Sequence, residues 1–154
     1  MKIGTIAQQL GTTVRTLRFY EEQGLVHPSR SAAGTRVYDQ ADQDRFAALL
    51  ALARLGFSLT TLSRLASIRP ASDTGDSASR AVDRRLAEMD AELAARAEAI
   101  ARQRDDLARA RALLHRCHGC ASPPRRRICD RCPVSAGVSG IAVLNIVWDE
   151  PVRD

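Results

Sequence analysis

Four cysteines near the C-terminus have the types and the spacing of a metal site. They are Cys117, Cys120, Cys129 and Cys132, which form two CxxC pairs separated by eight residues. Each pair can place two thiolates on one metal, and the loop between them lets the pairs converge. Four thiolates suit a tetrahedral zinc ion, and they also suit the two irons of a [2Fe–2S] cluster. The pattern predicts a metal-binding site and leaves both occupants open.

The surroundings of these cysteines favour ligand binding over redox catalysis. A thiol oxidoreductase that uses CxxC would need a βαβ unit around the motif, whereas these flanks are a predicted helix and an arginine-rich loop. The positive charges that would partly neutralise four thiolates are Arg125, Arg126, Arg127 and Arg131. No catalytic triad, carboxylate pair or phosphate-binding loop is apparent, so we expect a protein that is not an enzyme.

A second set of candidate residues lies near the N-terminus. Arg15 and Arg18 are three positions apart, so they share one face of a helix. Arginines in this arrangement can pair with phosphates or with the acceptor edge of guanine. Tyr20 lies near the end of the same helix, and Arg36 and Tyr38 follow at a distance that reaches the adjacent DNA backbone. These residues predict a DNA-binding surface, and a merely solvated basic face is the alternative.

The elements that must position the arginines follow from hydrophobic spacing and from breakers. We predict a short amphipathic helix over 3–10 and a second helix over 14–22. Gly11 ends the first helix, and Thr12 or Thr13 caps the second. Two short helices joined by a tight turn form a helix-turn-helix candidate.

The next segments complete a small N-terminal domain. Residues 27–38 are rich in small polar residues with a proline and a glycine, which predicts a hairpin or a loop. A helix is predicted over 39–55, and Ser58 can cap a further short helix that extends to Ile68.

A long helix is predicted after a linker at 70–77. Residues 78–116 contain no glycine or proline and consist mostly of good helix formers. A leucine or isoleucine recurs every seven residues, at Leu86, Leu93, Ile100, Leu107 and Leu114. This repeat predicts a coiled coil between two copies of the chain. The repeat of a single chain does not tell whether the two helices run parallel or antiparallel.

These features divide the chain into four parts. They are a DNA-binding domain (1–69), a linker (70–77), a coiled-coil dimerisation helix (78–116) and a cysteine-rich segment with its tail (117–154). The apolar run 141–148 in this tail leans towards a strand, and a short buried helix fits almost as well.

Charge and hydropathy narrow the partners. The 154 residues carry a net charge of +5, and residues 1–69 carry +4 of it, with nine basic and five acidic residues. A basic N-terminal domain favours a polyanion, with nucleic acid as the first candidate. Neither a secretory signal nor a membrane-spanning apolar stretch is visible, so we expect a cytoplasmic protein without a membrane partner.

Residues 2–66 resemble the DNA-binding domain of the mercury-resistance-regulator (MerR) family. The motifs that carry the resemblance are Arg15-Thr-Leu-Arg-Phe-Tyr-Glu, Gly24-Leu25, Gly34-x-Arg36-x-Tyr38 and Leu55-Gly56-Phe57-Ser58-Leu59. The resemblance implies a mainly α fold: a winged helix-turn-helix domain, a long dimerisation helix paired as an antiparallel coiled coil, and a C-terminal cysteine-rich metal-binding loop. It places Arg15 and Arg18 on the recognition helix, Tyr20 against phosphate, and Arg36 and Tyr38 in the wing.

The resemblance also implies a mechanism and two partners, promoter DNA and RNA polymerase. Similar regulators bind a two-fold operator between promoter elements that are spaced too far apart. The effector-bound dimer bends and untwists this DNA so that polymerase can read both elements. Deforming DNA costs roughly 1–6 kcal/mol, an amount that a small protein rearrangement can offset.

The resemblance bears on the cysteines as well. Metal sensors of the family carry effector cysteines just past the long helix, and Cys117 and Cys132 resemble the two ligands of the copper- and gold-type sensors. The redox-responsive branch holds a [2Fe–2S] cluster there, with its third cysteine close behind the second. Here Cys129 lies far from Cys120. We therefore predict one tetrahedral metal, zinc first, with a [2Fe–2S] cluster or a purely structural zinc as alternatives.

Overall fold

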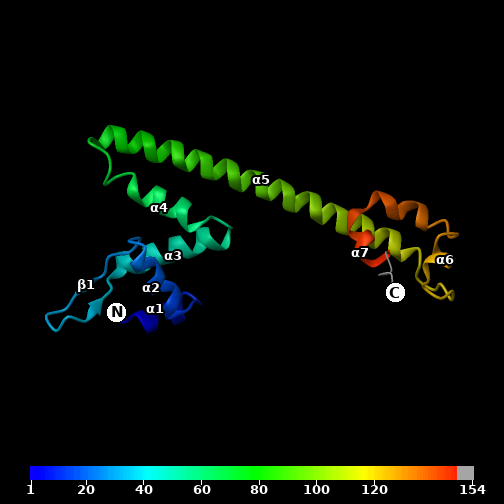
Figure 1. Cartoon of the computed structure of the whole chain (residues 1–154), viewed down its shortest axis with the longest axis horizontal. Helices are drawn as coiled ribbons and strands as arrows, with labels where there is room; N and C mark the ends of the chain where they lie inside the picture. The colour runs from blue at the N-terminus through cyan, green and yellow to red at the C-terminus, as the bar shows by residue number, and fades with distance from the viewer. Residues whose placement is uncertain (149–154) are drawn as a thin grey trace, which may run out of the picture. The chain divides into compact units, whose positions relative to one another are not determined.

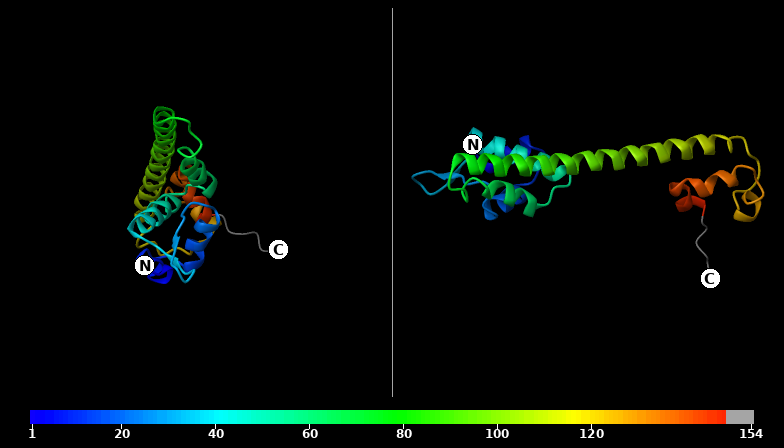
Figure 2. Two further views of the ribbon diagram at one scale, coloured as in Figure 1. Left: turned by 90° about the vertical axis from the view of Figure 1, so that its left-hand side faces the viewer. Right: turned by 90° about the horizontal axis from the view of Figure 1, so that it is seen from above.

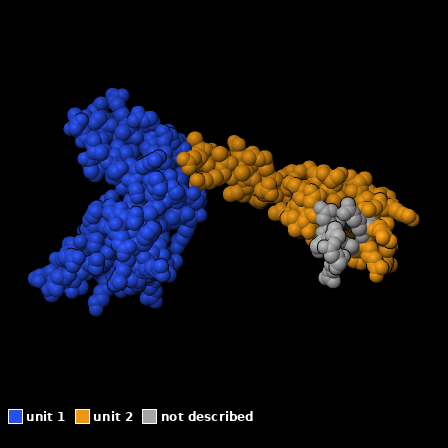
Figure 3. All heavy atoms as spheres, viewed as in Figure 1, with its two compact units in different colours: residues 1–90 blue, residues 91–154 orange. Residues whose placement is uncertain are grey.

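The computed structural model describes residues 1–148, and the chain divides into two compact units, residues 1–90 and residues 91–154 (Figure 1, Figure 3). The elements within the described residues are α1 (Ile3–Gln9), α2 (Val14–Glu22), β1 (Ser29–Arg30), β2 (Arg36–Val37), α3 (Gln40–Arg54), α4 (Leu59–Ser67), α5 (Gly75–His115), α6 (Arg126–Cys129), η1 (Ser135–Gly140), η2 (Ala142–Leu144) and α7 (Asn145–Trp148). The predicted mainly α fold with one long helix is confirmed.

The turn between α1 and α2 has the local features that a helix-turn-helix needs. Gly11 adopts a φ of 59°, a left-handed conformation that costs a residue with a Cβ about 1–2 kcal/mol. Thr13, rather than Thr12, caps α2, because its side chain accepts a hydrogen bond from the Thr16 backbone amide at 3.1 Å. Arg54 of α3 donates to the Leu10 carbonyl at 2.9 Å and so ties this turn to the rest of the unit.

A two-stranded hairpin follows α2, and we call residues 29–38 the wing. Strands β1 and β2 are antiparallel, and Arg30 lies directly opposite Arg36. Gly34 takes a φ of 77° in the turn between the strands, a conformation that glycine adopts without strain. Two views show the hairpin extending from the helices of its unit (Figure 1, Figure 2).

The core of the N-terminal unit lies where its short helices meet. Its fully buried large side chains are Phe46, Ile6, Leu17, Leu25, Leu62 and Val26. Helix α3 begins with a reciprocal capping box between Asp39 and Asp42, and α4 begins where Ser58 accepts from the Thr61 amide at 3.1 Å. These caps satisfy backbone donors that the first turn of a helix leaves unpaired.

Helix α5 begins earlier than the sequence predicts. It starts at Gly75, three residues before the predicted boundary. The Thr74 hydroxyl accepts from the Ser77 amide at 3.1 Å, and the Ser77 hydroxyl accepts from the Thr74 amide at 3.3 Å. This exchange caps the helix, so the last part of the predicted linker forms its first turn.

In the C-terminal unit the chain folds back along the end of α5 (Figure 1, Figure 2). We call the buried side chains that join them the tail cluster: Ala110, Leu113, Val134, Val138, Ile141 and Leu144. The approach is close, because a Cβ built on Gly137 would lie 2.9 Å from Leu113 Cδ1.

The tail corrects one expectation from the sequence. Residues 142–148 form η2 and α7 rather than a strand, so the lean towards a strand is wrong. Ile141 and Leu144 are three residues apart and both are buried in the tail cluster, a spacing that a helical turn satisfies and an extended chain does not. The end of the predicted C-terminal segment, 149–154, lies outside the described residues.

Candidate functional site

Helix α2 carries two exposed arginines on a base of buried side chains. Leu17 and Tyr20 are three residues apart and face the core, with 0% and 6% of their surface exposed. Arg15 and Arg18 are both exposed. The helix therefore presents two guanidinium groups to solvent while its opposite face holds it against the unit.

Tyr20 lies in the core rather than on the open surface. Burial raises the pKa of its hydroxyl, and the positive charge of Arg54 opposes that rise. A contact between Tyr20 and phosphate stays a prediction, and it would have to be made through the small part of the residue that reaches solvent.

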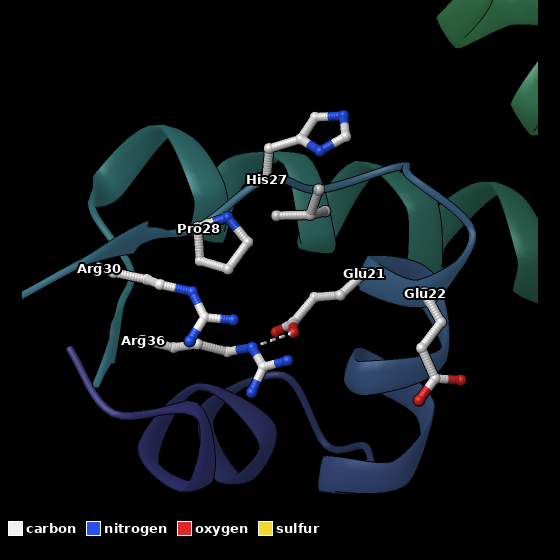
Figure 4. Close-up of a pocket in the computed structure, with 7 residues that line it drawn as sticks. Glu21, Glu22, His27, Pro28, Arg30 and Arg36 are labelled. Carbon is white, nitrogen blue, oxygen red and sulfur yellow. Dashed lines mark ion pairs between the residues drawn. The ribbon is translucent and has the colours of Figure 1, made fainter. Parts of the chain in front are cut away.

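The wing is joined to α2 through one carboxylate, that of Glu21. Arg36 Nε lies 3.0 Å from Glu21 Oε2, and the Glu21 side chain is only 7% exposed (Figure 4). The Tyr38 hydroxyl donates to Glu21 Oε1. Two residues that the sequence assigned to DNA contact are thus engaged by a third residue within the same unit.

Tyr38 is more deeply buried than Arg36. It is 2% exposed, and its ring lies 6.0 Å from that of Phe46. Burial raises the pKa of the Tyr38 hydroxyl, the bond to Glu21 and its negative charge raise that pKa further, and Arg36 and Arg18 oppose the rise. Arg18 of α2 and Arg36 of the wing thus act on the same hydroxyl with the same sign.

Sequence reasoning missed Glu21. The available signal was the alternation of Arg36 and Tyr38, because residues two apart on an extended strand point to one face. Two donors on one face call for a shared acceptor, and the last turn of the preceding helix supplies it.

An open pocket lies between the end of α2 and the wing (Figure 4). Its lining residues are Glu21, Glu22, Val26, His27, Pro28, Arg30 and Arg36. Arg30 Nη1 donates to the Gly34 carbonyl at 3.2 Å. The wing thus places two arginine side chains at this pocket, where a nucleic-acid backbone could approach.

The two CxxC pairs form matching turns in the C-terminal unit. The Cys120 amide donates to the Cys117 carbonyl at 3.0 Å, and the Cys132 amide donates to the Cys129 carbonyl at 2.8 Å. Each turn brings the backbones of its two cysteines close together. Cys117 and Cys132 are partly buried and pack against the tail cluster.

The chemistry of the four thiols fits a thiophilic metal. All four cysteines are free. Burial raises the pKa of the Cys129 thiol, and the neighbouring thiols of Cys132, Cys117 and Cys120 raise it further. Within residues 1–148, however, no three potential ligand side chains are gathered closely enough to form a metal site. The donor set fits, and coordination would require the two turns to close.

Comparison with known proteins gives the family. A model of the MerR HTH family regulatory proteins matches residues 1–67. The HTH-type transcriptional regulator ZntR of Escherichia coli is 34% identical over 96 residues, which are 60% of this chain and 68% of that protein. The ZntR homolog of Haemophilus influenzae is 33% identical over 91 residues, which are 58% of this chain and 67% of the homolog.

Solved structures share the fold. A MerR family transcriptional regulator from Listeria monocytogenes superposes with a TM-score of 0.66 at 17% identity, over 97% of this chain and 99% of that one. A MerR family regulator that lacks the sensor domain, solved bound to promoter DNA, gives 0.64 at 22% identity, over 78% of this chain and 94% of its own.

The two short helices, the wing and the long helix define a winged helix-turn-helix protein, as predicted. The chain belongs to the MerR family of helix-turn-helix regulatory proteins. The relatives named here are transcriptional regulators. Among the described residues, no helix is both long enough and apolar enough to span a bilayer.

Proposed function

We propose that this protein regulates transcription by binding promoter DNA as a homodimer, under the control of a metal held by four cysteines. The observation that carries the DNA part is the exposed pair Arg15 and Arg18 on α2 of a MerR-family domain. The net charge of +4 over residues 1–69 supports it, because neutralising phosphates dominates protein–DNA affinity.

In this proposal the residues of the first unit have distinct roles. Arg15 and Arg18 contact base edges or phosphates in the major groove, and Arg36 contacts the adjacent backbone. Tyr20 and Tyr38 hold the recognition helix and the wing in place, and their hydroxyls meet phosphate only where solvent reaches them. The bound dimer deforms the promoter for RNA polymerase.

A stripe on α5 supports the homodimer. Leu86, Ile100 and Leu107 occur at the predicted heptad spacing and are 50%, 61% and 50% exposed. Large aliphatic side chains repeated along one side of a helix are stabilised by a facing helix. A second copy of the chain, antiparallel as in the family, supplies that face.

Cys117, Cys120, Cys129 and Cys132 would hold the metal. A tetrahedral four-thiolate metal such as zinc supplies a crosslink between the two CxxC turns. Cys117 lies two residues after the end of α5, and Cys132 lies two residues before Val134, the first tail residue of the cluster. Closing the turns would therefore act on the packing of the tail against the long helix, which makes a sensory site the favoured proposal over a purely structural zinc.

The DNA part is tested by Arg15→Ala and Arg18→Ala, with Arg104→Ala as the matched control because Arg104 is an exposed arginine on α5. The probe is a duplex that the wild-type protein selects from a random-sequence pool. Each recognition-helix variant should weaken binding by about 1–3 kcal/mol, and the control should not. Wild-type affinity in both variants, with folding intact, would refute the interface.

The dimer is tested by Ile100→Glu, which places a charge in the middle of the stripe. We expect dissociation to monomers in sedimentation equilibrium, because the dimer interface would bury a carboxylate that has no partner of opposite charge. Ala101→Glu, one residue away and exposed, is the control. A stable dimer in both variants would place the interface elsewhere.

The metal is tested by absorption spectroscopy and metal analysis of protein purified without oxygen. One zinc per chain in a colourless protein supports the tetrahedral site. Visible bands, with about two irons and two sulfides per chain, would replace zinc with a [2Fe–2S] cluster. Transcription that is unchanged when the metal is removed from a folded, DNA-bound dimer would make the site structural.

A further inference from the structure

Glu21 is an acidic residue that the recognition helix turns inwards. Its side chain is 7% exposed, whereas the next residue, Glu22, is exposed. Taking a carboxylate out of water is unfavourable unless charged or polar partners replace its hydration. Both partners of Glu21, Arg36 and Tyr38, come from the second strand and the residue that follows it. The wing is therefore what makes this burial tolerable.

Arg36 is held in a way that leaves much of it free for a ligand. It meets Glu21 through Nε at 3.0 Å, and its side chain remains 49% exposed. A guanidinium group has five N–H donors in a rigid fork, so one engaged nitrogen sets the direction of the terminal nitrogens. Those terminal donors can form the paired hydrogen bonds that phosphate accepts.

The hairpin needs a counter-charge at this place. Arg30 lies directly opposite Arg36 across the two strands, and like charges at opposed positions disfavour strand pairing. In Figure 4 both arginine side chains run to the same side of the wing, where the Glu21 carboxylate meets Arg36. A wing of two short strands has few other bonds with which to hold this arrangement.

We propose that Glu21 is a positioning residue for the DNA interface. By engaging Arg36 and Tyr38 it fixes the wing beside α2, and it directs the terminal nitrogens of Arg36 towards a DNA phosphate. The inference rests on the proposed function, because DNA is the anion concerned. A carboxylate near DNA repels phosphate, so charge alone predicts that removing Glu21 tightens DNA binding. The positioning role predicts the opposite, that its removal weakens DNA binding.

The test compares Glu21→Gln with Glu22→Gln, which remove the same charge from neighbouring positions. The probe is the duplex that the wild-type protein selects from a random-sequence pool, titrated at several salt concentrations. Glu21→Gln should bind about tenfold more weakly, as expected for the loss of one charge-assisted contact. Its slope of log affinity against log salt should shrink by about one, the signature of one lost phosphate contact. Glu22→Gln should bind as wild type or tighter.

The salt slope separates positioning from stability. A residue that only stabilises the fold would lower the melting temperature and leave the slope of the folded protein unchanged. If Glu21→Gln binds like Glu22→Gln with the wild-type slope, the positioning role is overturned while DNA binding by the protein stands.

Hydrogen exchange of the free protein gives a readout that does not need DNA. Amides of the wing should exchange faster in Glu21→Gln than in Glu22→Gln, and equal protection would overturn the inference. If the wild-type protein binds no duplex and Glu21→Gln still shows the faster wing exchange, the proposed function fails and the wing contact stands. If Glu21→Gln does not fold, Arg36→Ala breaks the same contact from the exposed side, and unchanged wing protection there would refute the inference.

Discussion

Replacing Leu113 by alanine tests whether the tail cluster and the cysteine site depend on each other. Leu113 is 9% exposed, at the centre of the packing between α5 and the tail. Cys117 and Cys132 pack against the same cluster. We therefore expect Leu113→Ala to weaken metal binding although it removes no ligand.

The magnitude follows from the atoms removed. Leucine to alanine deletes about three carbon groups at ~0.8 kcal/mol each, and the cavity left behind raises the usual cost to about 2–5 kcal/mol. We take about 2 kcal/mol, because a cluster of six buried residues at the edge of a helix can partly collapse. If the metal binds only when the tail is docked, apparent affinity falls with the docked fraction, by up to roughly 30-fold.

The assay is anaerobic competition for zinc against a chromophoric chelator, together with hydrogen exchange over 134–144 in metal-free protein. Ile146→Ala is the matched control, since it removes the same number of carbon atoms from a position on α7 that is 81% exposed. Exchange in the tail should rise only in Leu113→Ala. Zinc affinity within twofold of wild type, despite faster tail exchange, would refute the coupling between cluster and ligands.

Three further predictions concern stability. Thr13→Ala removes the cap on α2, so the free energy of unfolding of the N-terminal unit should fall by about 1 kcal/mol. Its melting temperature, followed by circular dichroism, should fall by several degrees. An unchanged midpoint would show that the hydrogen bond to the Thr16 amide contributes nothing. Gly137→Ala forces a Cβ to 2.9 Å from Leu113, so tail exchange should rise, and wild-type protection would show that the leucine side chain adapts. Burial and Glu21 raise the pKa of Tyr38 above the ordinary 10.0. The folded state therefore favours the neutral phenol, the unfolding free energy should fall as pH rises above about 10, and urea titrations of Tyr38→Phe should show a smaller fall.

The elements of the N-terminal unit could be predicted because their boundaries depend on local chemistry. Helix α2 spans Val14–Glu22 as predicted, between a capping threonine and a glycine. The start of α5 was harder, since Gly75 is a poor helix former and only the cap exchange between Thr74 and Ser77 extends the helix to it. The run 141–148 has no decisive periodicity, and the burial of Ile141 and Leu144 against α5 is a tertiary contact that the run alone does not reveal.

Some features of the candidate site also follow from local sequence, whereas others depend on tertiary packing. That Arg15 and Arg18 share an exposed face follows from helical spacing alone. The burial of Tyr38 and the engagement of Arg36 do not, because both depend on where the wing packs. The alternation of Arg36 and Tyr38 indicates a shared acceptor, and the folded unit identifies that acceptor as Glu21. In the same manner, the spacing of the cysteines predicts the ligand set, whereas their contact with the tail cluster depends on how the chain folds back.

The position of Glu21 also constrains how the wing can respond to DNA. A phosphate that approaches Arg36 competes with the carboxylate for the same guanidinium, yet Nε and the terminal nitrogens can serve the two anions at once. Since Tyr38 donates a second hydrogen bond to Glu21, the carboxylate keeps a partner even while phosphate draws on Arg36. If the proposed interface is correct, the arrangement lets the protein add a DNA contact without leaving a buried charge unpaired, and an acidic residue can then belong to a DNA-binding surface.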